Sequence, residues 1–193
     1  MNRMSNLNPT RTAVLVVDVQ VGVFEANPAP LDKAHVLERI NQVTAAARAV
    51  AAPVIFLQHD GDPGTQWLTA FTDEWKLDPS LHIEDHDCVM RKTACDGFYK
   101  TALEAYLRDK AIETLVIMGY ATDFCVDTTV RSAASREFNV IVVAGAHTTK
   151  DRPVLAAKQI IAHHEWMWSN LICPKGVSLL SVAEVAERLT RAA

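Results

Sequence analysis

The sequence predicts a three-layer α/β/α fold, in which one mostly parallel six-stranded sheet lies between two layers of helices. Short apolar runs alternate along the chain with segments in which apolar residues recur every three or four positions. The first run is almost continuously apolar, as is typical of a strand buried on both faces. Strand and helix patterns that alternate in this way predict a parallel sheet. The chain has 193 residues, and we expect residues 1–193 to form a single domain.

Six short, mainly apolar runs are the expected strands. The first stays apolar until Asp18, and the second has Pro53 at its entry, where a missing N–H group costs least. The expected strands comprise residues 12–19, 53–58, 88–93, 114–119, 139–146 and 169–174. We expect the spatial order 3-2-1-4-5-6, which places the first and fourth strands side by side at the point where the order reverses.

Five further segments are expected to be helical. The clearest pattern places Val36, Ile40 and Val43 on one face, and Ser181 with Glu184 matches a capping box that opens the last helix. The expected helices comprise residues 36–50, 99–110, 123–136, 153–164 and 181–192. Residues 59–86 are rich in Gly, Pro, Asp and Trp and form a long loop, and loops of this length are usually functional.

Composition and charge argue against several classes of function. Hydrophobic residues make up 49% of the chain and charged residues 22%, which is ordinary globular composition. The net charge is −4 and the Lys and Arg residues are scattered, which argues against nucleic-acid binding. No run approaches the roughly 18 apolar residues that a membrane span needs, and residues 1–10 lack an apolar signal-peptide core. We therefore expect a soluble, cytoplasmic protein with no nucleic-acid or membrane partner.

Cys125 is the candidate nucleophile. The four cysteines lie far apart without a CxxC pair, so in a reducing compartment they are expected to be free thiols. Cys125 follows the fourth expected strand at the start of a helix. A helix N-terminus supplies positive potential and free N–H groups, which lower the pKa of a thiol and can hold an oxyanion. The alternative interpretation is a buried structural cysteine.

Asp18 and Lys92 are the candidate partners of this thiol. Asp18 closes a run of buried residues, where an isolated carboxylate is expensive, although it could instead cap the loop that follows. Lys92 ends the third expected strand, where a solvated lysine is also plausible. Together with Cys125 they form a chemical unit, because the carboxylate can take the thiol proton while the ammonium stabilises the thiolate and orients the carboxylate.

Four segments give the chain a resemblance to the isochorismatase-like cysteine hydrolases, and the resemblance covers nearly the whole sequence. The segments are VVDVQVGVF (16–24), RKTACDGFY (91–99), GYATDFCVDTTVRSA (119–133) and VVAGAHTTKD (142–151). The resemblance implies the Rossmann-like isochorismatase-type fold, a catalytic set of Asp18, Lys92 and Cys125, and a homodimer or homotetramer. It also implies a cis peptide at Tyr120–Ala121 and an oxyanion site formed by the N–H groups of Ala121 and Cys125.

Departures from subgroups of this family narrow the expected activity. True isochorismatases, which hydrolyse a vinyl ether, generally lack the cysteine. Nicotinamidases bind a metal through an Asp-x-His and a further His after the second strand, and this chain has Gln58, His59 and Asp60 there instead. A zinc site needs three or four convergent ligands, and the sequence offers no such set, so we expect no metal and no cofactor. The chain most resembles the amidohydrolase branch, and within it the streptothricin hydrolase-like group.

The predicted function is the hydrolysis of a non-peptide C–N bond, in an amide, ureide or carbamoyl group of a small molecule, through a thioester. A catalytically silent binding module on the same fold and an isochorismatase-type ether hydrolase are the alternatives. The predicted substrate-binding residues occupy loops after the strands and are mostly aromatic, which suits a small, partly apolar substrate. They are Gln20, Phe24, His59, Trp67, Tyr99, Tyr120 and Phe124. Gln20 could equally serve as an amide that stabilises its loop.

Overall fold

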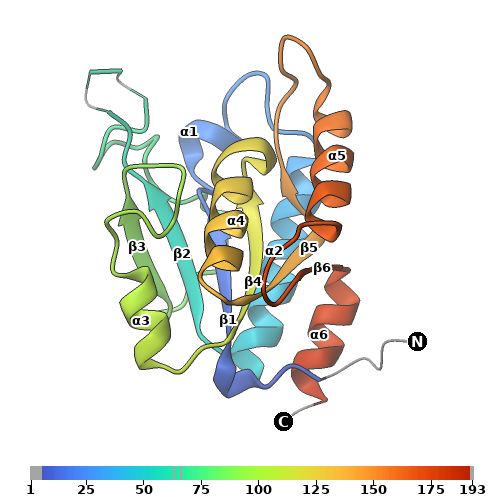
Figure 1. The fold of residues 1–193 in the computed structure, drawn as a ribbon. Helices are drawn as coiled ribbons and strands as arrows, with labels where there is room; N and C mark the ends of the chain where they lie inside the picture. The colour runs from blue at the N-terminus through green and yellow to red at the C-terminus, as the bar shows by residue number, and fades with distance from the viewer. Residues whose placement is uncertain (1–5, 63, 66, 192–193) are drawn as a thin grey trace.

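The computed structural model describes residues 6–62, 64–65 and 67–191, and its centre is a parallel sheet of six strands (Figure 1). The strands lie in the order β3-β2-β1-β4-β5-β6, which confirms the predicted fold class. Their bounds are β1 (Thr12–Val17), β2 (Val54–His59), β3 (Cys88–Lys92), β4 (Thr114–Tyr120), β5 (Asn139–Thr148) and β6 (Val177–Leu180).

Helices cover both faces of this sheet, with α4 in front of it and α2 behind it in Figure 1. Helices α2 and α6 pack on one face, and α3, α4 and α5 pack on the other. The helices are α1 (Val21–Phe24), α2 (Lys33–Ala49), α3 (Leu103–Asp109), α4 (Asp127–Ser135), α5 (Ala157–Ser169) and α6 (Val182–Thr190). Within the described ranges, no helix has both the length and the apolar character needed to cross a bilayer.

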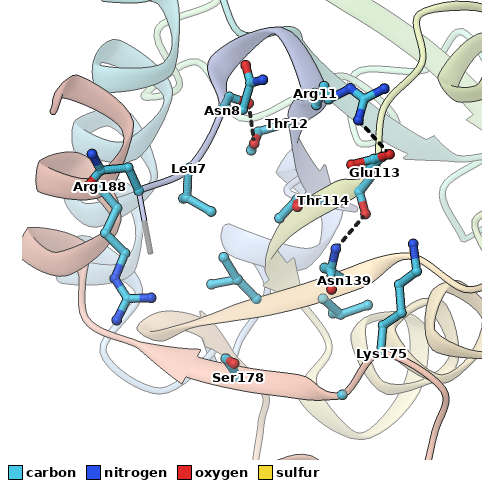
Figure 2. Close-up of a pocket in the computed structure, with 14 residues that line it drawn as sticks. Leu7, Asn8, Arg11, Thr12, Glu113, Thr114, Asn139, Lys175, Ser178 and Arg188 are labelled. Carbon is cyan, nitrogen blue, oxygen red and sulfur yellow. Dashed lines mark hydrogen bonds and ion pairs between the residues drawn. The ribbon is translucent and has the colours of Figure 1, made fainter. Parts of the chain in front are cut away.

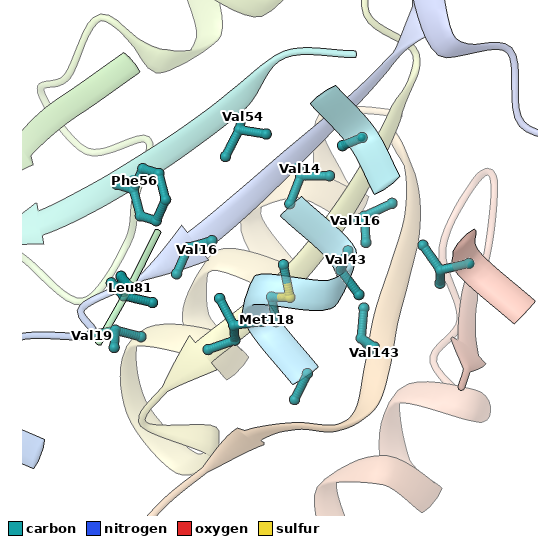
Figure 3. Close-up of a cluster of buried hydrophobic side chains, with 14 of the residues drawn as sticks. Val14, Val16, Val19, Val43, Val54, Phe56, Leu81, Val116, Met118 and Val143 are labelled. Atoms are coloured by element: carbon teal, nitrogen blue, oxygen red, sulfur yellow. The ribbon is translucent and has the colours of Figure 1, made fainter. Parts of the chain in front are cut away.

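The core is divided by the sheet, because successive side chains of a strand point to opposite faces. Val14 and Val16 of β1 face α2 and join a cluster with Val43, part of which Figure 3 shows. Leu15 and Val17 face the other way, toward α3 and α4. All six residues of β1 are buried, which explains why this strand reads as a continuous apolar run.

The sixth strand lies later in the chain than predicted. Residues 169–174 were expected to form it, but helix α5 continues to Ser169 and the strand pairs with β5 only from Val177 onward. The prediction for 169–174 was therefore wrong. β6 is an edge strand whose side chains are only partly buried, so its hydrophobic signal is weak beside that of the apolar end of α5.

Four helix starts differ from the prediction. Helix α2 begins three residues earlier than predicted, at Lys33, and α3 begins at Leu103 rather than at Tyr99, because residues 99–102 form turns and bends. Helix α5 begins at Ala157 rather than at Pro153, because Asp151 accepts the N–H of Ala157 (2.8 Å) and holds the preceding residues in a loop. The segment expected to begin α4 near residue 123 is a π-helical turn, Thr122–Val126, and α4 follows it at Asp127. Helix α6 begins at the predicted capping box, and Ala192, which it was expected to reach, lies outside the described residues.

Candidate active site

The candidate site lies at the carboxyl ends of four neighbouring strands, at the upper end of the sheet in Figure 1. Asp18 directly follows β1, and His59 and Lys92 are the last residues of β2 and β3, where they lie opposite each other in register. Cys125 lies on the π-helical turn after β4. The strand order therefore brings together side chains that are up to 107 positions apart in the sequence (18 to 125).

Two backbone features position this end of β1. Asp18 has a left-handed conformation (φ 49°), which turns the chain out of the strand while its N–H still donates to Leu57 O at 2.9 Å. Gly119, opposite Val17 on β4, has φ 121°, and a Cβ there would lie 2.2 Å from Val17 O. Only glycine therefore allows β4 to approach β1 this closely just before the turn that carries Cys125.

Lys92 is buried and uses each of its three ammonium protons. Its Nζ donates to Asp18 Oδ2 at 2.6 Å, to Ala94 O at 3.0 Å and to His59 Nδ1 at a longer 3.4 Å. Burial alone would lower the pKa of Lys92, but the charges and hydrogen bonds of Asp18 and Cys125 together outweigh burial and raise the pKa. Lys92 is therefore a fixed cation rather than a proton carrier.

Asp18 is buried and only half satisfied. Lys92 engages Oδ2, whereas Oδ1 has no hydrogen-bond partner among the described residues. Burial raises the pKa of this carboxyl, while Lys92 and then Cys125 lower it in part. A buried carboxylate oxygen without a partner is costly, and such exceptions call for a functional explanation.

Cys125 is partly buried beside this carboxylate. Burial raises the pKa of its thiol, and the negative charge of Asp18 raises it further. The expectation that a helix N-terminus would lower this pKa is therefore not met. Cys125 lies on the π-helical turn before α4, and burial together with the charge of Asp18 outweighs the attraction of Lys92. Burial and the neighbouring carboxylate thus both favour the neutral thiol.

The turn that carries Cys125 begins at a cis peptide between Tyr120 and Ala121, the position that the resemblance indicates. The carbonyl oxygen of Ala121 accepts the N–H groups of Phe124 and Val126, each at 3.0 Å. These two bonds close the turn around Cys125, between the end of β4 and α4.

A cavity of about 300 Å³ is lined by Asp18 and Cys125. Its lining residues lie at or after the carboxyl ends of strands β1 to β5 and are mostly apolar. They are Asp18, Val23, His59, Trp67, Leu68, Cys95, Tyr120, Ala121, Phe124, Cys125 and Arg152. Of the residues predicted to bind substrate, His59, Trp67, Tyr120 and Phe124 line this cavity.

The other three predicted substrate-binding residues lie elsewhere. The amide of Gln20 is buried and fully used: it donates to His59 O (3.0 Å) and Trp75 O (2.8 Å), and it accepts His59 N (2.8 Å). Gln20 therefore holds the loop behind the site. Phe24 is completely buried and packs edge-on against Tyr120, and Tyr99 is half exposed outside the cavity.

Four lining residues were not predicted: Val23, Leu68, Cys95 and Arg152. Arg152 and Cys95 had a usable signal, because they lie four residues after β5 and three residues after β3, at the same edge of the sheet. Leu68 has no such signal, because it is brought over the site by the long loop, where Gly61 N donates to Leu68 O at 2.9 Å.

A second cavity, of about 330 Å³, lies at the amino ends of the strands (Figure 2). It is polar, and its Arg11 is paired with Glu113 at 2.8 Å, as the dashed line in Figure 2 marks. Its lining residues include no cysteine, histidine or unpaired buried carboxylate. The cavity lined by Asp18 and Cys125 is therefore the candidate active site, because it contains a carboxyl group and a thiol that could take part in a reaction.

The described residues contain no group of three His, Cys, Asp or Glu side chains arranged to hold a metal ion. His59 lines the cavity but is engaged with Lys92, and the adjacent His163 and His164 lie on α5 with their rings nearly perpendicular (88°). The described site offers acid–base and nucleophilic groups rather than a ligand set.

Comparisons with known proteins identify relatives of this chain. A streptothricin hydrolase from Streptomyces noursei is 36% identical over 141 residues, which cover 73% of this chain and 56% of that protein. The ureidoacrylate amidohydrolase of Methylobacterium radiotolerans is 32% identical over 176 residues, covering 72% of this chain and 68% of the relative. The crystal structure of a cysteine hydrolase from Pseudomonas syringae pv. phaseolicola superposes with a TM-score of 0.88 at 25% identity, over 100% of both chains.

The chain spans about half the length of the streptothricin hydrolases that it matches. Both curated relatives described above are named as hydrolases, and one of them as an amidohydrolase. The Isochorismatase domain of the family matches residues 12–170, which include the whole candidate site. The resemblance drawn from the sequence motifs is confirmed, and the chain belongs to the isochorismatase family.

Proposed function

We propose that this protein is a cysteine amidohydrolase that cleaves a non-peptide C–N bond of a small molecule without a metal or cofactor. The observation that carries the proposal is the unpartnered Oδ1 of buried Asp18, beside the thiol of Cys125 and in the same cavity. Nucleophilic catalysis by a thiol requires a base that can remove the thiol proton, and a carboxylate with a free oxygen beside the thiol can do so. The printed names of the relatives support C–N bonds as the target.

In the first half of the proposed reaction, Cys125 Sγ attacks the carbonyl carbon while Asp18 takes the thiol proton. Proton transfer accompanies attack, because burial keeps the resting sulfur protonated. The N–H groups of Ala121 and Cys125 are the proposed donors to the oxyanion. Asp18 then passes its proton to the leaving nitrogen, the C–N bond breaks, and the acyl group remains as a thioester on Cys125.

In the second half, Asp18 takes a proton from water as the water oxygen attacks the thioester carbonyl. The C–S bond breaks, the proton returns to the sulfur, and the carboxylic or carbamic acid leaves. Lys92 stays an ammonium ion throughout and holds Asp18 by the 2.6 Å contact to Oδ2. It balances the charge of the carboxylate whenever Asp18 is ionised.

We further propose that the protein forms a homodimer or homotetramer in the cytoplasm and acts on a small-molecule substrate. Family resemblance supports the oligomer, and the free state of all four cysteines is compatible with a reducing compartment. Light scattering on the purified chain tests the oligomer, and a single monomeric mass would contradict it.

The proposal is tested by release of ammonia or amine from a panel of amides, ureides and carbamoyl compounds after exhaustive chelation. The native protein is compared with Cys125→Ala and with Cys173→Ala, which removes a free cysteine outside the cavity. We expect turnover by the native protein and by Cys173→Ala in EDTA, and none by Cys125→Ala. Turnover that Cys125→Ala retains, or that chelation abolishes, would contradict the mechanism. Silence across the panel would favour the non-enzymatic alternative.

A further inference from the structure

The charged groups that line the active-site cavity are already neutralised by partners within the protein. Asp18 is paired with Lys92 at 2.6 Å, and Arg152 is paired with Asp123, which lies on the nucleophile turn. The described lining residues therefore offer a substrate no uncompensated charge, apart from what His59 could supply.

Arg152 is held by hydrogen bonds from Nε and Nη2 of its guanidinium. Its Nε donates to Asp123 Oδ2 at 2.8 Å, and its Nη2 donates to Asp123 Oδ1 at 3.1 Å and to Thr149 Oγ1 at 3.0 Å. The guanidinium also lies 4.8 Å from the ring centre of Phe124. Burial opposes ionisation of Asp123, but Arg152 and Thr149 together lower its pKa, so the pair stays ionised and compensated.

His59 adds no charge to the cavity. Burial lowers the pKa of its ring, and the neighbouring Lys92 ammonium lowers it further. An ammonium can only donate, so His59 Nδ1 is the acceptor in the contact with Lys92, and the neutral ring carries its proton on Nε2. His59 is thus an uncharged hydrogen-bond donor.

The remaining wall is apolar or aromatic: Val23, Trp67, Leu68, Tyr120 and Phe124. A charged substrate group that enters such a cavity loses its hydration and finds no unpaired counter-charge, which is costly. A flat, uncharged group loses little hydration and contacts the aromatic side chains.

We propose that the cavity selects substrates whose enclosed part is uncharged, flat and mainly apolar, and that Asp123 sets this preference by neutralising Arg152. The inference rests on the proposed amidohydrolase function and specifies its substrate class. It makes Asp123 and Arg152 specificity-determining residues, because removing either charge leaves the other uncompensated at the cavity wall.

A charge series on one scaffold tests this proposal. Benzamide, 4-carbamoylbenzoate and 4-(aminomethyl)benzamide differ mainly in net charge, and kcat/KM for each is measured with the native protein and with Asp123→Asn. We expect the native protein to prefer benzamide over both ions by at least about tenfold, which is modest beside the cost of burying a free charge. Asp123→Asn should raise kcat/KM for the anion relative to benzamide and leave the cation disfavoured, because Arg152 is then free.

Two further measurements keep the test decisive if Asp123→Asn folds poorly or no member of the series is hydrolysed. Arg152→Gln should not raise kcat/KM for 4-carbamoylbenzoate relative to benzamide, since this variant lacks the guanidinium that would attract the carboxylate. Binding of the same three compounds to Cys125→Ala, measured by calorimetry, reports the charge preference without turnover. Tighter binding of the anion than of benzamide by Cys125→Ala would overturn the inference. The absence of any hydrolysis by the native protein would instead count against the proposed function.

Discussion

Strand β3 is flanked by two buried ion pairs, and they differ in how fully they are satisfied. At its amino end Arg48 binds Asp87 through Nε (3.1 Å) and Nη2 (2.6 Å), and Asp87 Oδ2 also accepts Glu84 N at 2.8 Å. At its carboxyl end Lys92 binds only one oxygen of Asp18, and the other has no partner among the described residues. The side-chain exposures are similar, 7% and 0% for the first pair and 0% and 5% for the second.

Burial is therefore similar in the two pairs and each joins one cation to one carboxylate, but only in the Asp18–Lys92 pair does a carboxylate oxygen lack a partner among the described residues. The Arg48–Asp87 pair connects α2 to the start of β3, and both carboxylate oxygens of Asp87 accept hydrogen bonds. In the Asp18–Lys92 pair, Oδ1 of Asp18 has no partner among the described residues and lies beside the thiol of Cys125. A saturated pair stabilises a fold, whereas a partly satisfied pair can take part in a reaction.

The largest effect is expected from Asp18→Asn, which removes the base. The amide can still accept a hydrogen bond from Lys92 but cannot take the thiol proton, so we expect kcat to fall by about 10²–10⁴-fold. Steady-state kinetics with the best substrate of the panel measures the loss. A fall of less than tenfold would show that Asp18 is not the base.

A smaller and graded effect is expected from pH. Asp18 must be ionised to act, and burial raises its pKa, so kcat should begin to fall at a higher pH than an ordinary aspartate would cause. Below that pKa the loss should approach about tenfold per pH unit. Because the folded pKa lies above the unfolded one, protonation of Asp18 adds stability as the pH falls, so this loss of activity is not unfolding. His59→Asn should retain the acid limb of kcat; its disappearance in that variant would assign the limb to His59.

Gln20→Met should change activity less. The amide fixes both the N–H and the carbonyl of His59 and anchors Trp75 O, so its loss frees buried backbone groups behind the cavity. We expect a loss of about 1–3 kcal/mol in the free energy of unfolding and a few-fold rise in KM. Urea unfolding and kinetics on the same preparation measure both, and an unchanged stability would contradict the role given to Gln20.

Asp87→Asn should have the smallest effect on activity, because Asp87 lies at the opposite end of β3 from the nucleophile. It should leave kcat/KM unchanged while lowering the free energy of unfolding by about 1.5–3 kcal/mol, the value of hydrogen bonds to a charged group. Denaturant unfolding measures the stability. Loss of activity in a folded Asp87→Asn protein would remove the distinction between the two pairs.

Several features could be predicted from the sequence because they depend on neighbouring residues. Buried strands such as 12–17 are marked by continuous apolar runs, and the Ser181–Glu184 capping box marks the start of α6. The alternation of strands and helices led to the sheet order, and the motif around Cys125 led to the family. The edge strand β6 was misplaced, because its side chains are only partly buried and its hydrophobic pattern is weak. The apolar residues that follow α5 have a stronger pattern, which predicts the strand there instead.

The sequence by itself determined the layered fold, the family and the identities of Asp18, Lys92 and Cys125 as candidates, since each follows from a local pattern. Only the tertiary structure decided how those groups are used. The unpartnered oxygen of Asp18, the raised pKa of Cys125 and the neutralised Arg152 all arise from contacts between strand ends far apart in the chain. Desolvation and hydrogen-bond saturation are properties of the assembled surroundings, and no single segment of the sequence contains them.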